Sequence, residues 1–400
     1  MTLEITVTPA STINVEMGPY GLRGPQGEAG LQGLQGLQGE QGVSAVMVAG
    51  YFFRSSALCG GNDPAGGKYA GSASAVERRS LSVPSMLVNI GGSALLLADG
   101  VSLDVESVQS WDSGAYALAA NRAGRDFYLY ACLPVSGSVP DFVLSANNTI
   151  PSVIPSGAVP AAGNSRKIGG FHCLCVAVGS IGGHDLSGYL AGDVLPRSVW
   201  DLDFQPMSLP EGMVFGRHGQ WVDIYLPSVL GGELVSVNGG TIADGTSAVK
   251  FHPYKFDQWF GRIAKKPIAS LEFVAASLGA NQGTNIAGGI DPVTTGGHSD
   301  SAGRRMISNI GCEDMCGVMR QWGREQGGAH SGSGTTPAFD TNDSGVGGSH
   351  SYAPVRAGFG GYWGESALCG SRNSLWGQSV LSLIQFYSSR GVSEMACSRV

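Results

Sequence analysis

The stretch GPYGLRGPQGEAGLQGLQGLQGEQG, residues 18–42, places glycine at every third position from Gly18 to Gly42. Only glycine fits at the crowded axis of three wound polyproline-II chains, so this period predicts a collagen-like triple helix and a parallel homotrimer. At about 3 Å per residue the rod would be roughly 75 Å long. With only Pro19 and Pro25 it is marginal by itself, so flanking domains must hold the chains together. The alternative is an accidental run of the pattern in a disordered linker.

The segment before the glycine repeat, residues 1–17, alternates polar and apolar residues and predicts one or two short strands. A small β-element in front of a stalk is well placed to attach to a larger assembly. It carries no basic residue and no apolar run, so it is not a secretory signal. No stretch approaches the roughly 18 apolar residues of a membrane-spanning helix. We therefore expect a protein folded in a cytoplasm and not inserted in a membrane.

The composition argues against several classes of protein. The chain of 400 residues has 42% hydrophobic and 14% charged residues, which argues against a disordered protein. A net charge of −7 with no Lys/Arg-rich run argues against a nucleic-acid binder. The cysteines match no zinc framework, and we interpret them as buried thiols. They are Cys59, Cys132, Cys173, Cys175, Cys312, Cys316, Cys369 and Cys397. The sequence predicts no metal and no other cofactor.

Residues 43–210 contain short β-rich runs separated by turn residues and show no long helical period. The runs are Ala45–Phe53, Ser82–Ile90, Ala94–Leu97, Asp126–Leu133 and Phe171–Val178. This pattern predicts a β-sandwich or β-prism domain, which we expect to be a trimerising one. His172 and His184 fall in or beside these runs and are expected to be structural.

Residues 211–400 mix strand and helix patterns. An alternating strand is expected over 221–227, and a helix over 253–263 with an apolar stripe and Pro253 in its first turn. A second helix is expected from an N-cap at Ser270 to Gly279. The spacing of Met315, Val318, Met319 and Trp322 predicts a third helical stretch. Residues 327–351, rich in Gly and Ser, are expected to form a long structureless insertion.

Four pieces of this half resemble, in order, the C-type-lectin-like domain shared by the formylglycine-generating enzyme family and the tropism determinants of bacteriophages. Pro267 followed by Leu271-Glu272-Phe273 and Ala275-Ala276 resembles the family's LPTEAEWEYAA helix. Residues 304–318 (RRMISNIGCEDMCGV) with Trp322 are similar to its turn with the D-M-x-G-N-V-W-E-W pattern. Residues 360–363 (GGYW) and 369–372 (CGSR) resemble its GGSW and GSR strand, and residues 389–392 (SRGV) resemble its closing strand.

Together with the stalk, this resemblance implies a phage tail fibre or receptor-binding protein. Its fold class would be an α+β and β-rich multidomain fibre with a collagen-like triple helix, a middle β-domain and a C-terminal lectin-like fold. Residues 1–17 would attach the homotrimer to phage tail or baseplate proteins. The expected partner is a host receptor, whether lipopolysaccharide, capsule, pilus or outer-membrane protein. Such a protein is assembled in the host cytoplasm and resides in the virion.

The enzymatic branch of the resembled family uses a pair of cysteines around the GGSW strand to oxidise a substrate cysteine with copper. This sequence has one cysteine there, Cys369, and a lone thiolate does not supply the paired ligands. The EPN, QPD and WND motifs of calcium-dependent lectins are absent as well. The expectation is therefore a binding protein and not an enzyme.

The tropism-determinant branch displays side chains from its final strand region on a static scaffold. Here that region combines Tyr and Trp with Ser and Asn, the mixture found in antibody loops. The expected receptor-binding residues are Tyr362, Trp363, Glu365, Ser366, Leu368, Arg372, Asn373, Ser374, Trp376 and Gln378. The alternative for individual members, above all Trp363 and Trp376, is a place in the core.

Two other function classes stay open at this point. A depolymerase that cleaves a surface glycan would need two carboxylates roughly 5–9.5 Å apart across a groove. The candidates are Asp223, Asp257, Glu272, Glu313, Asp314 and Glu365, and none forms a recognisable pair in the sequence. His298, His330 and His350 lack an evident triad partner. A purely structural spacer fibre would have no need of a lectin-like head.

Overall fold

The computed structural model describes residues 77–327 and 354–396, together with the backbone of six short strands outside those ranges. The chain forms two compact units, Met1–Val48 and Ala49–Val400. In the first unit, β1 (Leu3–Val7) and β2 (Ile13–Met17) pair as an antiparallel hairpin, which confirms the short strands expected there. The glycine repeat of residues 18–42 lies outside the described residues.

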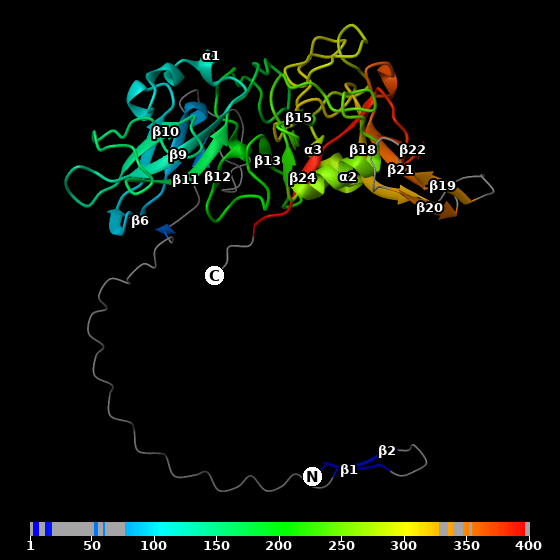
Figure 1. Cartoon of the computed structure of the whole chain (residues 1–400), viewed down its shortest axis with the longest axis horizontal. Coiled ribbons are helices and arrows are strands. Elements are labelled where there is room, and N and C mark those ends of the chain that lie inside the picture. The colour runs from blue at the N-terminus through cyan, green and yellow to red at the C-terminus, as the bar shows by residue number, and fades with distance from the viewer. Residues whose placement is uncertain are drawn as a thin grey trace. The chain divides into compact units, whose positions relative to one another are not determined.

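The first half of the second unit is β-rich, as predicted, and its three sheets are drawn in blue to green in Figure 1. Their strand orders are β3 (Phe52–Arg54), β6 (Met86–Ile90), β7 (Ser93–Leu97); β4 (Cys59–Gly60), β5 (Ser80–Val83), β8 (Val101–Asp104); and β10 (Asp141–Ser145), β9 (Asp126–Cys132), β11 (Ser165–His172), β12 (Trp200–Asp201). Its one described α-helix, α1 (Ala119–Arg122), is a single turn. Apolar side chains from all three sheets share one core.

The predicted strand over 171–178 is wrong beyond His172. Strand β11 runs from Ser165 to His172, and the chain then leaves the sheet, with only an isolated bridge from Cys173 to Val194. Cys173 and Cys175 are nevertheless buried. Burial in a loop therefore produced the apolar alternation that we interpreted as a strand.

Among its described residues, the second half contains two four-stranded sheets and two α-helices (Figure 1). One sheet has the order β13 (Met213–Phe215), β14 (Trp221–Asp223), β24 (Gly391–Ser393), β17 (Lys266–Pro267). The other has the order β22 (Gly370–Ser379), β21 (Val355–Gly360), β18 (Arg320–Gly327), β23 (Tyr387–Ser389). A hairpin joins β15 (Ser228–Leu230) to β16 (Glu233–Val235). The closing strand β24 thus lies between β14 and β17.

The strand expected over 221–227 is confirmed only for β14, which ends at Asp223. Beyond it the backbone donates to acceptors outside any strand ladder: Ile224 N–H to the Gly212 carbonyl at 2.7 Å, and Tyr225 N–H to Ser236 Oγ at 3.0 Å. The strand ends here because the N–H groups of Ile224 and Tyr225 are bound by these acceptors and not by a neighbouring strand.

Helix α2 (Pro253–Arg262) confirms the predicted helix over 253–263. Its first turn contains Pro253 and is capped by the His252 imidazole, which accepts from Lys255 N–H at 3.3 Å. Phe256 and Phe260, one turn apart, are fully buried, so the apolar stripe does face the core.

Helix α3 (Ser270–Ala276) lies where the second helix was expected, but its N-cap is Ala269 and not Ser270. The Glu272 carboxylate reaches back and accepts from the Ala269 N–H at 2.7 Å, which satisfies the backbone donor of the N-cap residue. The helix ends before Gly279, whose φ of +85° is left-handed.

The predicted third helix is wrong. Residues 315–317 form a turn between the isolated bridge residues Glu313 and Val318, and β18 begins at Arg320. Asp314 and Gly317 have φ values of +59° and +76°, which break any helix through this segment. The four apolar residues whose spacing suggested a helix, Met315, Val318, Met319 and Trp322, are all fully buried. Their spacing reflects burial in an irregular turn, so Cys312 and Cys316 do not share a helix face either.

The predicted structureless insertion over 327–351 is wrong in part. Within it, β19 (Thr335–Phe339) and β20 (Gly347–Ser351) pair as antiparallel strands. The segments around this hairpin lie outside the described residues.

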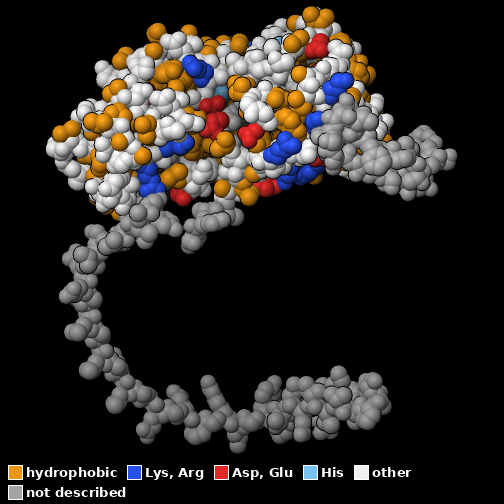
Figure 2. Space-filling view, viewed as in Figure 1, with side chains coloured by type: hydrophobic (Ala, Val, Ile, Leu, Met, Phe, Trp, Pro, Cys, Tyr) orange, Lys and Arg blue, Asp and Glu red, His pale blue; other side chains and the backbone are white. Residues whose placement is uncertain are grey.

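Figure 2 shows charged side chains in small groups of both signs on one face of the molecule, in keeping with a chain that is 14% charged. In the part of the chain that the structure describes, no helix is long and apolar enough to cross a membrane.

Candidate functional site

Strand β22 forms the edge of its sheet, where β21 is its one partner among the described strands. The pairing with β21 shifts register twice, so the strict inward and outward alternation of a regular strand is lost. Four successive residues, Ser374 to Gly377, are consequently all exposed. Trp376 has 47% of its surface open to solvent. The strand therefore presents a continuous polar and aromatic face.

All ten predicted receptor-binding residues lie on β22 or in the turn of residues 361–369 that leads into it. The exposed ones are Ser366, Leu368, Arg372, Ser374 and Trp376, and the half-buried ones are Tyr362, Trp363, Glu365, Asn373 and Gln378. The core alternative is wrong for Trp376, whereas Trp363 packs with part of its surface against buried Met306, Val318 and Met319. We call this set the β22 face.

The β22 face is supported from below by Arg320 on β18, which is only 3% exposed. Its guanidinium donates to Asn373 Oδ1 at 2.7 Å and also binds the Glu365 carboxylate. Tyr362 stacks on Phe386 with ring centroids 4.2 Å apart. These contacts fix the turn and the strand, so the exposed side chains are displayed on a rigid base.

Sequence reasoning missed two members of this site. Leu375 is exposed between Ser374 and Trp376, where regular alternation would have buried it. Arg320 carries no sequence signal, because an arginine inside the expected third helix looks like any solvated cation. Only the loss of that helix and the pairing of β18 with β21 reveal its role.

The six carboxylates considered for glycan hydrolysis each have a cationic or histidine partner. The pairs are Asp223–Lys265, Asp257–Arg356, Glu272–Arg324, Glu313–Arg305, Asp314–His298 and Glu365–Arg320. Glu313 and Asp314 are also fully buried. Among these six, no two free carboxylates face each other across a groove, which is the arrangement that hydrolysis requires.

A buried polar chain joins the first half of this unit to the second. His172 Nδ1 lies 2.9 Å from Asp126 Oδ1, and His172 Nε2 lies 3.0 Å from the Tyr225 hydroxyl. Cys175 Sγ donates to Glu313 Oε1 at 3.4 Å.

His184 is likewise buried, with Nε2 3.1 Å from the Ile307 carbonyl. Both histidines are structural, as expected, while His330 and His350 lie outside the residues whose side chains are described.

His298 and Asp314 form a partly buried ion pair whose strength depends on pH. Burial alone would lower the pKa of His298, but the hydrogen bond and charge of Asp314 at 2.9 Å outweigh it and raise that pKa above 6.5. A raised histidine pKa stabilises the fold below about pH 6.5 and loses that contribution as pH rises through the folded value.

We therefore expect the urea concentration at the unfolding midpoint to be lower at pH 9 than at pH 6. This decrease should be smaller in His298→Gln. Measuring both proteins by tryptophan fluorescence at the two pH values checks this. An equal fall in the two proteins would contradict the assignment.

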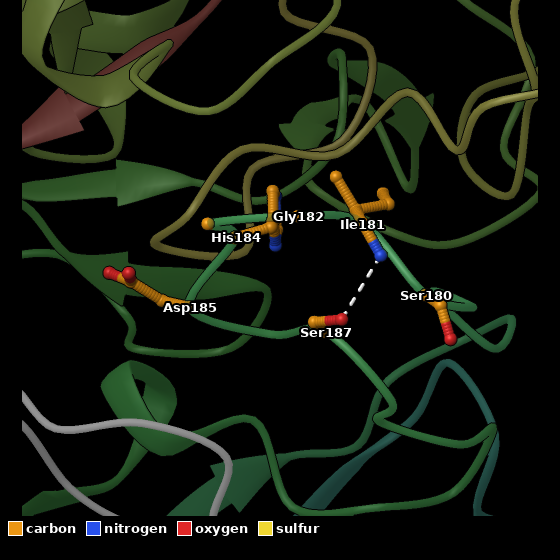
Figure 3. Close-up of a pocket in the computed structure, with 7 residues that line it drawn as sticks. Ser180, Ile181, Gly182, His184, Asp185 and Ser187 are labelled. Carbon is orange, nitrogen blue, oxygen red and sulfur yellow. Dashed lines mark hydrogen bonds between the residues drawn. The ribbon is translucent and has the colours of Figure 1, made fainter.

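A hollow of about 500 Å³ is lined by Ser180, Ile181, Gly182, Gly183, His184, Asp185 and Ser187 (Figure 3). All these residues come from one loop, closed by a bond from Ile181 N–H to Ser187 Oγ at 3.0 Å. Asp185 is paired with Arg217, and His184 binds backbone on both ring nitrogens. The two titratable side chains that line the hollow are therefore already bound within the protein, so it is a poor candidate for a ligand site.

The six cysteines described, all buried, are free thiols, which confirms the expectation for them. Burial raises the pKa of Cys369 to about 11, so it remains a thiol near neutral pH. In residues 77–327 and 354–396 no cluster of three His, Cys, Asp or Glu side chains could hold a metal ion.

The chain is similar to known proteins in both sequence and fold. Residues 79–201 match the family model described as the Mtd second domain. The tail fiber receptor-binding protein of Bordetella phage BPP-1 is 29% identical over 314 residues, which cover 74% of this chain and 77% of that relative.

Solved structures agree with this. The Major Tropism Determinant I1 variant superposes with a TM-score of 0.64 at 24% identity, covering 80% of this chain and 82% of that one. The P3c variant gives a TM-score of 0.62 at 25% identity, with the same coverage. The resemblance to phage tropism determinants is therefore confirmed, and these neighbours support the lectin-like fold expected for residues 211–400.

Proposed function

We propose that this chain is a phage tail-fibre adhesin that binds a receptor on the host cell surface and so brings about adsorption. The relative from Bordetella phage BPP-1 is named a tail fiber receptor-binding protein, and the solved neighbours are named tropism determinants. The similarity extends over more than two thirds of both chains, which supports a shared role of the whole protein and not of one module.

The observation that carries the proposal is the β22 face. It combines an exposed tryptophan, an exposed arginine and several hydroxyl and amide groups on an edge strand. Large aromatic surfaces and adaptable polar groups are what protein recognition surfaces use. Because Arg320 and the Phe386 ring hold the turn and the strand in place, little conformational freedom is lost on binding.

The proposed assembly is a homotrimer. Residues 1–17 attach it to the phage tail or baseplate, residues 18–42 form a collagen-like triple helix, and residues 43–210 form a trimerising β-sandwich or β-prism. In each of the three chains, residues 211–400 form a lectin-like head at the far end of the virion fibre. The fibre is assembled in the host cytoplasm. Three linked heads on a repetitive surface raise avidity without any new contact.

Binding without catalysis is favoured over a depolymerase. The six candidate carboxylates are all paired, and the β22 face holds only one of them, Glu365, which is bound to Arg320. A spacer fibre is disfavoured because it would not need a rigidly supported recognition face. The receptor itself, whether a glycan or a surface protein, is the remaining question.

The test is binding of the labelled full chain to host cells that are intact, treated with periodate or treated with protease. Released reducing sugar is assayed in the same tubes, and a strain that resists the parent phage serves as control. We expect binding to intact cells without sugar release. Periodate-sensitive binding assigns a glycan receptor, and protease-sensitive binding assigns a protein. Steady sugar release, or equal binding to the resistant strain, would contradict the adhesin function.

A further inference from the structure

A second cavity, of about 430 Å³, opens beside the start of β22. Its walls are Ser277, Leu278, Gly279, Ala280, Gln282, Arg304, Ser371 and Arg372. They come from three segments far apart in the sequence: the end of α3 with its following loop, the turn around Arg304, and the first residues of β22. Arg372 belongs to the β22 face, so the cavity adjoins the surface already proposed to bind a receptor.

The walls of this cavity are tied together. The Gln282 side-chain oxygen accepts from Ser371 N–H at 3.0 Å and from Ser371 Oγ at 3.3 Å. Gly283 N–H donates to the Cys369 carbonyl at 2.7 Å. Gln282 therefore fixes β22 against the loop that follows α3, and the cavity is a preformed feature of the fold.

The charge in the cavity is positive. Arg304 and Arg372 line it, and none of the lining residues carries a carboxylate. One terminal nitrogen of Arg304 binds the Gly279 carbonyl, which orients the guanidinium. Within the described residues, the remaining side-chain nitrogens of Arg304 and the whole guanidinium of Arg372 have no protein acceptor. Two guanidinium groups thus have N–H donors free for an anion.

The acidic residue nearest to Arg304 along the chain makes no ion pair with its guanidinium. Asp300 is 2% exposed, and its carboxylate accepts from Ala302 N–H and Arg304 N–H at 2.9 Å each and from the Thr284 hydroxyl at 2.7 Å. The carboxylate is bound by these three neutral donors and not by a guanidinium. Within the described residues, neither Arg304 nor Arg372 forms an ion pair with a carboxylate.

The uncharged lining identifies the rest of the ligand. Gln282 is exposed, and its amide nitrogen has one N–H beyond the one that it donates to the Ala280 carbonyl at 3.3 Å. The Ser371 hydroxyl oxygen can accept a hydrogen bond, and Leu278, which is 50% exposed, offers an apolar wall. Hydroxyl-rich rings with apolar C–H faces match such a lining. The volume falls in the range of small-molecule sites, about 300–1,000 Å³, and exceeds what one Asp or Glu side chain fills.

We propose that this cavity binds a monosaccharide unit that carries a carboxylate or a phosphate group, as part of a host surface glycan. The inference rests on the proposed adhesin function and names the class of receptor for one part of the same head. Arg304 and Arg372 bind the anionic group, Gln282 and Ser371 bind the ring hydroxyls, and Leu278 packs against the ring.

The test is ligand-detected NMR on the full chain with glucuronate and glucose 6-phosphate, which separate carboxylate from phosphate. Glucose is the neutral match, inorganic phosphate is the anion alone, and a short capped Asp-Asp peptide represents an acidic protein. We expect an acidic sugar to bind more tightly than all three. Arg372→Gln and Arg304→Gln are each expected to weaken it about tenfold, the loss typical of one charge-assisted hydrogen bond. Arg262→Gln, an exposed arginine on α2, serves as the matched control and is expected to leave binding unchanged.

Equal binding of glucose, of inorganic phosphate or of the peptide overturns the proposal, as does unchanged binding in Arg372→Gln, whose exposed side chain is not needed for folding. Adsorption to host cells is measured with the same preparations. Adsorption without acidic-sugar binding overturns the cavity and leaves the adhesin function standing. Sugar binding without adsorption overturns the adhesin function and leaves the cavity as a sugar site.

Discussion

Replacing Arg390 with leucine is expected to unfold the C-terminal half of the protein. Arg390 is fully buried, and its guanidinium donates to the carbonyls of Asp223 and Ile224 at 2.7 and 2.8 Å. It also donates to the Glu313 carbonyl at 2.6 Å and to Gln321 Oε1 at 2.9 Å. Leucine would remove the guanidinium donors from all four buried acceptors, of which the Ile224 carbonyl keeps a bond from Glu313 N–H at 2.8 Å. Each buried acceptor left without a donor costs about 1–3 kcal/mol, so several of them amount to a large part of the 5–15 kcal/mol that stabilises a typical domain.

Thermal unfolding followed by circular dichroism measures this effect. Arg390→Lys keeps a cation but reaches fewer acceptors, so we expect it to fall between the wild type and Arg390→Leu. Arg262→Leu is the matched control, because Arg262 is exposed and loses only a contact with the Trp259 ring at 5.1 Å. A midpoint for Arg390→Leu equal to that of the control would show that the guanidinium does not hold these segments together.

The second large effect concerns binding. Trp376→Ala is expected to lower the affinity of one head by roughly 30-fold, the loss of about 2 kcal/mol at a tryptophan hot spot. In a fibre with three linked heads the loss compounds, so adsorption falls further. Because Trp376 is half exposed, its removal leaves the thermal midpoint nearly unchanged.

Adsorption of the labelled full chain to host cells, measured beside its thermal midpoint, separates these two quantities. Leu230→Ala on β15 is the control, since Leu230 is an exposed apolar residue, with 67% of its surface open to solvent, on a strand other than β22. Tyr362 is a poorer probe because its ring stacks on Phe386 and supports the turn. Unchanged adsorption of Trp376→Ala would place the receptor contact on another part of the head.

The sequence predicted features that depend on local chemistry. Helix α2 followed from apolar spacing and Pro253, and the β22 face was expected from its mixture of Tyr and Trp with Ser and Asn. The third helix failed because buried residues in an irregular turn happen to repeat at helical spacing. Left-handed residues such as Asp314 and Gly317, which break that helix, have no signature strong enough to outweigh the pattern.

The candidate site was only partly predictable for the same reason. Its exposed residues are contiguous in the sequence, so composition found them. Arg320, which fixes them, and Arg304, which shares a cavity with Arg372, lie 53 and 68 positions away from their partners Asn373 and Arg372. Only the folded chain brings such residues together, because neither periodicity nor composition carries information on contacts at that separation.

The position of β24 has a consequence for biosynthesis. This strand, at residues 391–393, pairs with β14 through Trp221–Ser393 and Val222–Val392, and Arg390 beside it binds carbonyls 77 to 167 residues earlier in the chain. The sheet that opens the C-terminal half is therefore incomplete until residues 391–393 have left the ribosome. Until then its earlier apolar strands are exposed in the nascent chain. Synthesis of β24, and not the pairing of the earlier strands, sets the earliest moment at which this part of the protein can fold.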